Sequence, residues 1–400
     1  MASSDRRIDL DWVRILAFGV LIFFHVGMYY VTWGWHVKSP FASHTIEPLM
    51  MLSSPWRLSL LFFVSGCATA FLYAKSTTGF VRSRTQRLLI PLVFGMWVIV
   101  PPQSWAQVTE AVGYHGGYLH FMALYATGYG DFCRDGCLRI PTWNHLWFVA
   151  YLWCYTMVAA LAWWAMPQRP IDRLGAAVAT CLRGPWLIAL PVAWLAAIRI
   201  TLVARFPDTH ALVDDWYLHA EYFSIFTLGL LLAREKDVWD EIRRQRWIAL
   251  ALALVGYGAV ATYFAHYDEI VPPEWLRQTQ RAFHALDTWC AIVAALGFAR
   301  QWNPADSRAR RYFTEAIFPF YIVHQTAIVL LAHFMKPLAL PPIVEAPLLI
   351  TATAATCLAS LEVVRRVGWM RPLFGLAPVP PAAPAPSSGG APMFRRRVPD

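Results

Sequence analysis

The chain has 400 residues, of which 58% are hydrophobic and only 15% carry a charged side chain. Soluble domains carry about 25% charged residues, so this composition excludes an ordinary soluble protein and predicts an integral membrane protein. The formal net charge is +9, but the basic residues lie between apolar stretches and form no single patch, so we expect no nucleic-acid partner.

Ten apolar stretches are each close to the roughly 20 residues that a helix needs to cross a lipid bilayer. They cover residues 11–33, 49–74, 86–103, 145–166, 185–204, 217–233, 247–265, 282–299, 313–334 and 345–365. Most Lys and Arg residues fall in alternate connections, which places both termini on the cytoplasmic side. We therefore predict an all-α polytopic bundle over residues 1–375, followed by a disordered Pro/Ala-rich cytoplasmic tail over 376–400.

The first apolar stretch contains two ionisable residues, Arg14 near its start and His25 deep inside. Eleven residues of helix place both side chains on one face, roughly 16 Å apart along the axis. Ionisable groups within a membrane-spanning helix are costly and usually mark a functional site. The alternative is structural: Arg14 pairs with Asp11 one turn away, and His25 bonds a neighbouring helix.

The longest connection runs from Ser104 to Asn144, is rich in Gly, Tyr and His, and has room for a short helix. We place it outside the membrane, where an oxidising compartment allows a local disulfide between Cys133 and Cys137. Because no second pair of ligands accompanies these cysteines, we predict no metal site there or elsewhere in the chain.

Several later spans carry ionisable groups at a depth similar to that of His25. His324 in the ninth span lies at about the same level, Arg57 enters the outer half of the second span, and His145 opens the fourth span at its outer end. A structural role, as a hydrogen-bond partner of another helix, is an equal alternative for His324.

The cytoplasmic end of the bundle is basic, since Arg84 and Arg87 lie on the same side as Arg14. Arginine binds phosphate in a fork geometry, so this end suits a phosphate-bearing ligand, although the two residues could also be ordinary positive-inside anchors. A histidine farther along the same face could act as a general base. No GxSxG motif is present, which favours base-assisted transfer over a serine acyl-enzyme.

Other polar and aromatic residues receive a structural interpretation first. Trp143 and Trp147 suit an interfacial aromatic belt, with sugar stacking as the alternative. Glu221 and Asp287 are interpreted as salt-bridge partners. The H-x4-D pattern at 210–215 also occurs in soluble glycerolipid acyltransferases, but it falls in an outer loop, so we discount it.

Five motifs in order resemble those of the membrane acyltransferase 3 family. They are LDWVR with His25 after ten intervening residues, LFFVSG at Leu61–Gly66, RSRTQRLLIP at Arg82–Pro91, HLWFVAYL at His145–Leu152 and FYIVHQ at Phe320–Gln325. Each motif is weak alone, but the ordered set extends over most of the ten spans. The subgroup that looks most similar succinylates periplasmic glucans.

This resemblance implies a multi-pass enzyme of the bacterial inner membrane, which moves an acetyl or succinyl group from cytoplasmic acyl-CoA to a hydroxyl of a carbohydrate. It implies acyl-CoA as the donor substrate and no permanently bound cofactor. It also implies that Arg14 and His25 are critical. Residues that it places near the pore are Ser65, Arg84, Arg87, His145 and Tyr321.

The leading hypothesis is an O-acyltransferase in which His25 accepts the proton of a carbohydrate hydroxyl or relays the acyl group. Arg14 and His324 complete the candidate catalytic set, and Arg57 joins the candidate substrate-binding residues. The second hypothesis is a transporter or flippase of an anionic or sugar-linked substrate, with the buried Arg and His residues along its path. The missing internal repeat argues against it.

Overall fold

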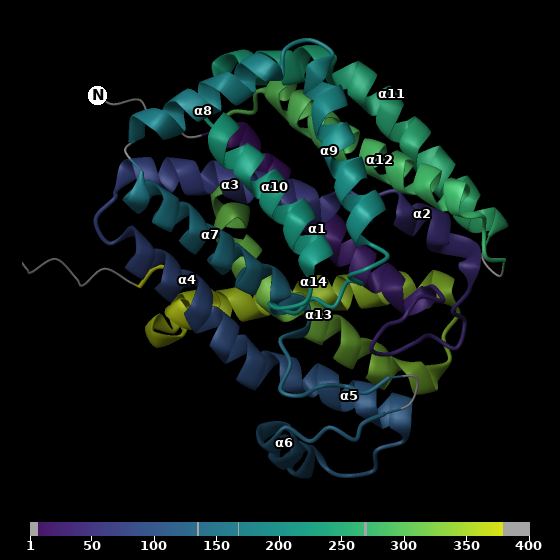
Figure 1. Ribbon diagram of the computed structural model, residues 1–400. Helices are drawn as coiled ribbons and strands as arrows, with labels where there is room; N and C mark the ends of the chain where they lie inside the picture. The colour runs from purple at the N-terminus through teal and green to yellow at the C-terminus, as the bar shows by residue number, and fades with distance from the viewer. Residues whose placement is uncertain (1–6, 134–135, 167, 268–269, 379–400) are drawn as a thin grey trace, which may run out of the picture.

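A computed structural model describes residues 7–133, 136–166, 168–267 and 270–378, and every regular element in these ranges is helical (Figure 1). The α-helices are α1 Ile8–Tyr30, α2 Glu47–Met51, α3 Arg57–Lys75, α4 Phe80–Phe94, α5 Val100–Val112, α6 Tyr118–Thr127, α7 Trp147–Ala165, α8 Gln168–Cys181, α9 Trp186–Leu202, α10 Trp216–Leu232, α11 Lys236–His266, α12 Glu274–Trp302, α13 Arg308–Met335 and α14 Pro342–Arg366. Four short 3₁₀ segments are η1 His44–Ile46, η3 Asn144–Leu146, η4 Lys336–Leu338 and η5 Gly368–Phe374, and the π-helical η2 Gly95–Ile99 joins α4 to α5.

Each predicted apolar stretch overlaps at least one helix, and the chain is a multi-pass membrane protein. Within the described residues, eight helical segments are long and apolar enough to cross a membrane, or nine if α8 and α9, which meet at 104°, count as one broken span. The helix α10, with 17 residues, covers the sixth predicted stretch and is shorter than the roughly 20 residues of a full span. The count of ten and the cytoplasmic termini therefore stay predictions.

Two predicted boundaries were wrong. The second apolar stretch does not begin a continuous helix at residue 49, because α2 ends at Met51 and α3 starts only at Arg57. The intervening Pro55 disfavours helical backbone at the residue before it. The third stretch runs on through α5, so the long connection begins at Gly113, whose left-handed φ of 66° caps the helix, and not at Ser104.

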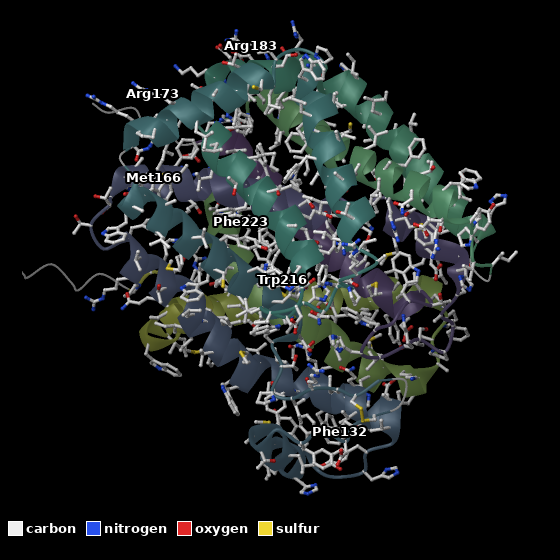
Figure 2. All side chains as sticks on the ribbon, in the orientation of Figure 1. Phe132, Met166, Arg173, Arg183, Trp216 and Phe223 are labelled. Atoms are coloured by element: carbon white, nitrogen blue, oxygen red, sulfur yellow. A yellow bond between two sulfur atoms is a disulfide. The ribbon has the colours of Figure 1, made fainter. Side chains whose placement is uncertain are left out.

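The long connection contains the expected short helix, α6, and a disulfide joins Cys133 to Cys137. It lies at the opposite end of the molecule from α8: Phe132 marks one end, and Arg173 and Arg183 mark the other (Figure 2). Of the predicted disordered tail, residues 379–400 lie outside the described ranges.

The first helix is the centre of the arrangement. It packs against α3, α12, α13 and α14 (Figure 1). Its residues Leu10, Val13, Ala17 and Leu21 recur at helical spacing and are at most 6% exposed, as expected of a face buried against neighbouring helices. Residues on this face therefore reach several helices at once.

Two glycines let α3 and α10 cross at close range. A Cβ atom at Gly66 would meet the carbonyl oxygen of Phe226, and one at Gly229 would meet the carbonyl oxygen of Phe63. The thiol of Cys67 donates to the Gly229 carbonyl oxygen at 3.1 Å. Small residues permit this kind of contact between membrane helices.

We expect Gly229→Leu to lower the thermal unfolding midpoint of the detergent-purified protein, because the new side chain would meet the backbone of Phe63, which cannot move aside as a side chain could. Overpacking typically costs about 1–3 kcal/mol. Gly19→Ala is the control, since a Cβ there meets nothing within 4 Å. An unchanged midpoint in the Gly229 variant would contradict this helix crossing.

Candidate functional site

Two histidines from helices at opposite ends of the sequence meet inside the bundle. His25 Nδ1 on α1 lies 2.8 Å from His324 Nε2 on α13. Their rings are stacked with centroids 5.0 Å apart. His324 is fully buried, whereas His25 is partly accessible and lines a cavity. The predicted similar depth of the two residues is confirmed, and so is the interpretation that each bonds a neighbouring helix.

The hydrogen bonds of this pair assign its tautomers. His324 Nδ1 lies 2.8 Å from the carbonyl oxygen of Tyr321 and 3.1 Å from that of Phe320. Because a carbonyl oxygen only accepts, the proton is on Nδ1, and the neutral ring is left with Nε2 as an acceptor. His25 must then donate from Nδ1, which leaves its Nε2 unprotonated. The site therefore presents a basic nitrogen on the accessible histidine.

The cavity beside His25, which we call the histidine cavity, has a volume of about 350 Å³. Its lining residues are Leu21, His25, Trp35, His36, Arg57, Leu58, Thr142, Trp143, Asn144, His145, Trp147, Phe148, Thr209, His210, Tyr321 and Gln325. Aromatic side chains and uncharged polar groups predominate among them. The predicted residues His25, Arg57, His145 and Tyr321 are thus brought together.

A chain of polar contacts holds one wall of the histidine cavity. His36 Nδ1 lies 2.6 Å from Gln107 Oε1, and its Nε2 accepts from Gln325 Nε2 at 2.8 Å. Gln325 also donates to Gln103 Oε1 at 3.1 Å, and Gln103 Nε2 lies 3.5 Å from His145 Nδ1. His145 Nε2 donates to a backbone carbonyl of α13 at 3.1 Å. The chain is consistent with neutral rings throughout, and burial lowers the pKa of the loop residue His36.

A second cavity, of about 460 Å³, lies farther toward the start of α1, and we call it the arginine cavity. Four arginines line it, namely Arg7, Arg14, Arg84 and Arg87. Ser65 on α3 is also part of its wall. Four of the sequence-predicted residues therefore share this second cavity and not the histidine cavity.

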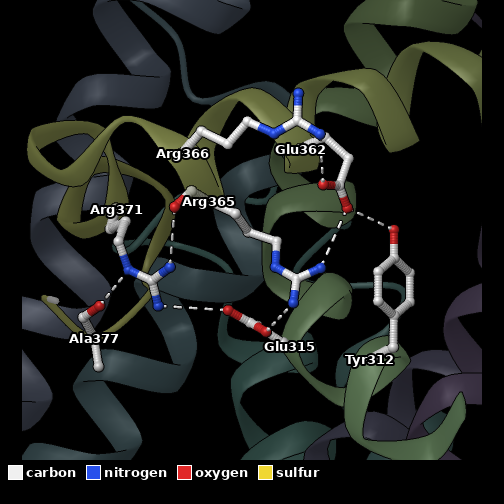
Figure 3. A network of polar contacts seen from close by, with 7 residues as sticks. All are labelled: Tyr312, Glu315, Glu362, Arg365, Arg366, Arg371 and Ala377. Carbon is white, nitrogen blue, oxygen red and sulfur yellow. Dashed lines mark hydrogen bonds and ion pairs between the residues drawn. The ribbon is translucent and has the colours of Figure 1, made fainter. Parts of the chain in front are cut away.

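The carboxylates that line the arginine cavity bind arginines from outside it. Asp11 accepts from Arg310, which is 2% exposed. Glu315 lies 3.4 Å from Arg371 and 3.5 Å from Arg365, in a network that joins α13, α14 and η5 (Figure 3). Arg7 pairs with Asp9 at 2.7 Å. Because four arginines and only two carboxylates line the cavity, its lining carries a net positive charge, which suits an anion.

One layer of aromatic side chains separates the two cavities. Phe148 lines both of them, Phe18 lines the arginine cavity, and Tyr321 lines the histidine cavity. The ring of Tyr321 lies 5.7 Å from Phe18 and 6.0 Å from Phe148. The Tyr321 hydroxyl donates to the His145 carbonyl oxygen, which holds this layer against the polar wall.

Several residues that line the cavity or its wall were not among the site residues predicted from the sequence. Trp143 and Trp147 line the histidine cavity, and so does His210, which we had discounted. Gln103 was missed, although an uncharged polar residue at the end of a predicted span was a usable signal. His36 lies in a loop and offered no such signal. Glu221 does lie near Arg199, at 3.8 Å, as predicted for a salt-bridge partner.

Asp287, by contrast, forms no salt bridge with any described residue, so the prediction of a salt-bridge partner was wrong for this residue. It is 2% exposed. Its Oδ2 has no hydrogen-bond partner among the described residues.

Comparison with known proteins identifies one family. A family model described as an acyltransferase domain matches residues 7–362, which is most of the chain. No curated protein and no solved structure matches the chain in the corresponding comparisons.

The hydrogen-bond pattern predicts opposite tautomers for two histidines. In ¹⁵N spectra of protein labelled at histidine, His25 should show a protonated Nδ1, and His145 a protonated Nε2, which serves as the internal control. His324→Leu removes the acceptor and should shift His25 toward a mixture of tautomers. A protonated Nε2 on His25 in the unmodified protein would contradict the assignment.

Proposed function

The chain belongs to the acyltransferase 3 family, and from this premise we propose which transfer it catalyses. It is an acyltransferase of a membrane. In our proposal it moves an acetyl or succinyl group from cytoplasmic acyl-CoA to a hydroxyl of a periplasmic or cell-surface carbohydrate, in the bacterial inner membrane. The substrates, the direction and the membrane are all part of the proposal.

The observation that carries the proposal is the position of His25 relative to the arginine cavity. Arg14 and His25 share α1 at a separation of roughly 16 Å along its axis. Arg14 lines the cationic cavity, and His25, whose Nε2 is left unprotonated, lines the other cavity beyond the aromatic layer. An anionic donor and a neutral acceptor would thus approach one reaction centre from two sides.

The arginine cavity supports acyl-CoA as the donor. Arg84 and Arg87 are three residues apart on α4, which puts them on the same face of the helix. Both line the cavity together with Arg14. Guanidinium groups bind phosphate oxygens through paired N–H donors. With the phosphates held there, the thioester end of the donor would extend toward the aromatic layer and His25.

The histidine cavity supports a carbohydrate as the acceptor. Trp35, Trp143 and Trp147 supply flat apolar faces, and Thr142 and Asn144 supply hydrogen-bonding groups. A few polar groups among aromatic side chains can orient a ligand that has both apolar C–H faces and hydroxyl groups. This cavity contrasts with the arginine cavity, which suits an anion.

His25 would take the acceptor's proton in the direct route. The hydroxyl oxygen attacks the thioester carbonyl carbon while its proton moves to His25 Nε2, the C–S bond breaks, and the CoA thiolate recovers that proton. In the relay route, Nε2 itself attacks the carbonyl carbon, the C–S bond breaks and the CoA thiolate leaves. The acyl group then passes from Nε2 to the hydroxyl oxygen, whose proton goes to the thiolate. Both routes need the unprotonated Nε2, and His324 acts as a positioning residue for it.

Thioester consumption distinguishes this proposal from a transporter. CoA release that depends on a carbohydrate acceptor supports the enzyme. Uptake of substrate by vesicles without consumption of acyl-CoA would support the transporter or flippase and would overturn the proposal.

His25→Ala should abolish acyl transfer by the purified protein, a loss of about 10²–10⁴-fold if the residue is a general base. His324→Ala should lower kcat, whereas His324→Gln should recover part of it, since an amide oxygen can accept from His25 Nδ1. The measurement is release of labelled CoA with a glucan acceptor.

The control for these variants is His266→Ala, because His266 is exposed at the end of α11. It should leave both membrane insertion and activity unchanged. A fully active His25→Ala protein would refute the assigned role.

The aromatic layer generates a separate prediction. Phe148→Ala should raise CoA release in the absence of acceptor, because a smaller side chain lets water reach the thioester from the histidine cavity. Phe334→Ala is the control, since Phe334 is 65% exposed on α13. Unchanged acceptor-free release would show that Phe148 does not separate the two cavities during turnover.

A further inference from the structure

Arg57 is a buried cation in the wall of the histidine cavity. It begins α3, is 6% exposed, and lines the cavity together with His25. Its guanidinium carbon lies 3.3 Å above the ring of Phe24 on α1. Stacking on an aromatic face orients a planar guanidinium and leaves its N–H groups, which lie in the plane, available to other partners.

The charge of Arg57 is not compensated by an acid. Its Nε and Nη1 atoms are buried and have no hydrogen-bond partner in the part of the chain that the structure describes. No Asp or Glu in that part forms an ion pair with it, whereas the similarly buried Arg310 binds both Asp11 and Asp306. Burying a charge without a partner is costly, so such a residue is expected to meet an anion when the site is filled.

The other residues that line the histidine cavity also indicate that Arg57 meets an anion supplied by the ligand. Among its lining residues that the structure describes, Arg57 is the one permanent cation and no carboxylate is present. The nearby acid Glu221 already accepts from Tyr217 at 2.5 Å and lies 3.8 Å from Arg199. An oxyanion on a substrate is therefore the partner that the cavity lacks.

We propose that Arg57 forms a binding site for a carboxylate carried by the substrate, so that the enzyme transfers a dicarboxylic acyl group of the succinyl class. This inference rests on the proposed function and deepens it. The acyl carbon is placed at His25 and the free carboxylate at Arg57, whose paired N–H donors match a carboxylate in fork geometry. The second possible source of the same anion is an acidic group on the acceptor carbohydrate.

The test compares succinyl-CoA with butyryl-CoA, which has a neutral acyl group of similar length, in the purified protein with a neutral glucan. Arg57→Met removes the charge and keeps a long side chain. We expect kcat/KM for succinyl-CoA to fall about 10²-fold, as for one lost buried charge pair, while that for butyryl-CoA changes little. Arg57→Lys should retain part of the preference.

Three other outcomes would overturn the proposal. An equal loss for both donors would overturn the proposal, because Arg57 would then act on the reaction centre or on folding. No loss for either donor would also overturn it. A loss that appears only with an acidic glucan, whichever donor is used, assigns the anion to the acceptor and rejects the succinyl assignment.

A binding measurement tests the anion site at Arg57 independently of acyl transfer. Free succinate should raise the thermal unfolding midpoint of the unmodified protein more than the uncharged succinamide does, and Arg57→Met should remove that difference. Arg205→Met, which changes an exposed arginine outside the cavity, is the matched control. If succinate stabilises the protein but no acyl transfer is detected, the anion site stands and the proposed function fails. If acyl transfer is detected but succinate does not stabilise the protein, the proposed function stands and the anion site fails.

Discussion

The hydrogen bond between His25 and His324 is the constraint on which the candidate site depends. It joins α1 to α13 across almost the whole sequence, at 2.8 Å. Because His324 uses its other nitrogen on carbonyls of its own helix, the direction of the bond is determined, and with it which nitrogen of His25 is basic. A shift of either helix by one turn would break the pair and leave His324 buried without its partner.

Around this pair the bundle separates two kinds of chemistry. The arginine cavity is cationic, since four arginines line it and only two carboxylates do, one of which, Glu315, also binds arginines of α14 and η5 (Figure 3). The histidine cavity has aromatic walls, neutral rings and one buried guanidinium. A single layer formed by Phe148 and its neighbours divides them. In the proposed reaction this layer would keep the anionic donor and the hydroxyl acceptor apart, and protected from water, until they meet at His25.

Much of this arrangement could be predicted from residue types alone. Arg14 and His25 in one apolar stretch indicated a functional face, and the helical period placed them on it. His324 was predicted at the level of His25, because depth in a membrane helix follows from residue count. The partition of the candidates was not predictable: Ser65, Arg84 and Arg87 share one cavity and His145 and Tyr321 another, since that depends on how helices distant in sequence rotate against one another.

The sequence by itself determined the helical class, the membrane setting and the family, because apolar length, charge placement and ordered motifs are local properties of the chain. Only the tertiary structure decided which nitrogen of His25 is basic, that Arg57 is buried with no acid among the described residues as its partner, and that Gln103 and His36 belong to the wall of the site. Each of these is a relation between side chains from different helices. Helical periodicity specifies which face a residue occupies, but packing of the whole bundle decides what that face meets.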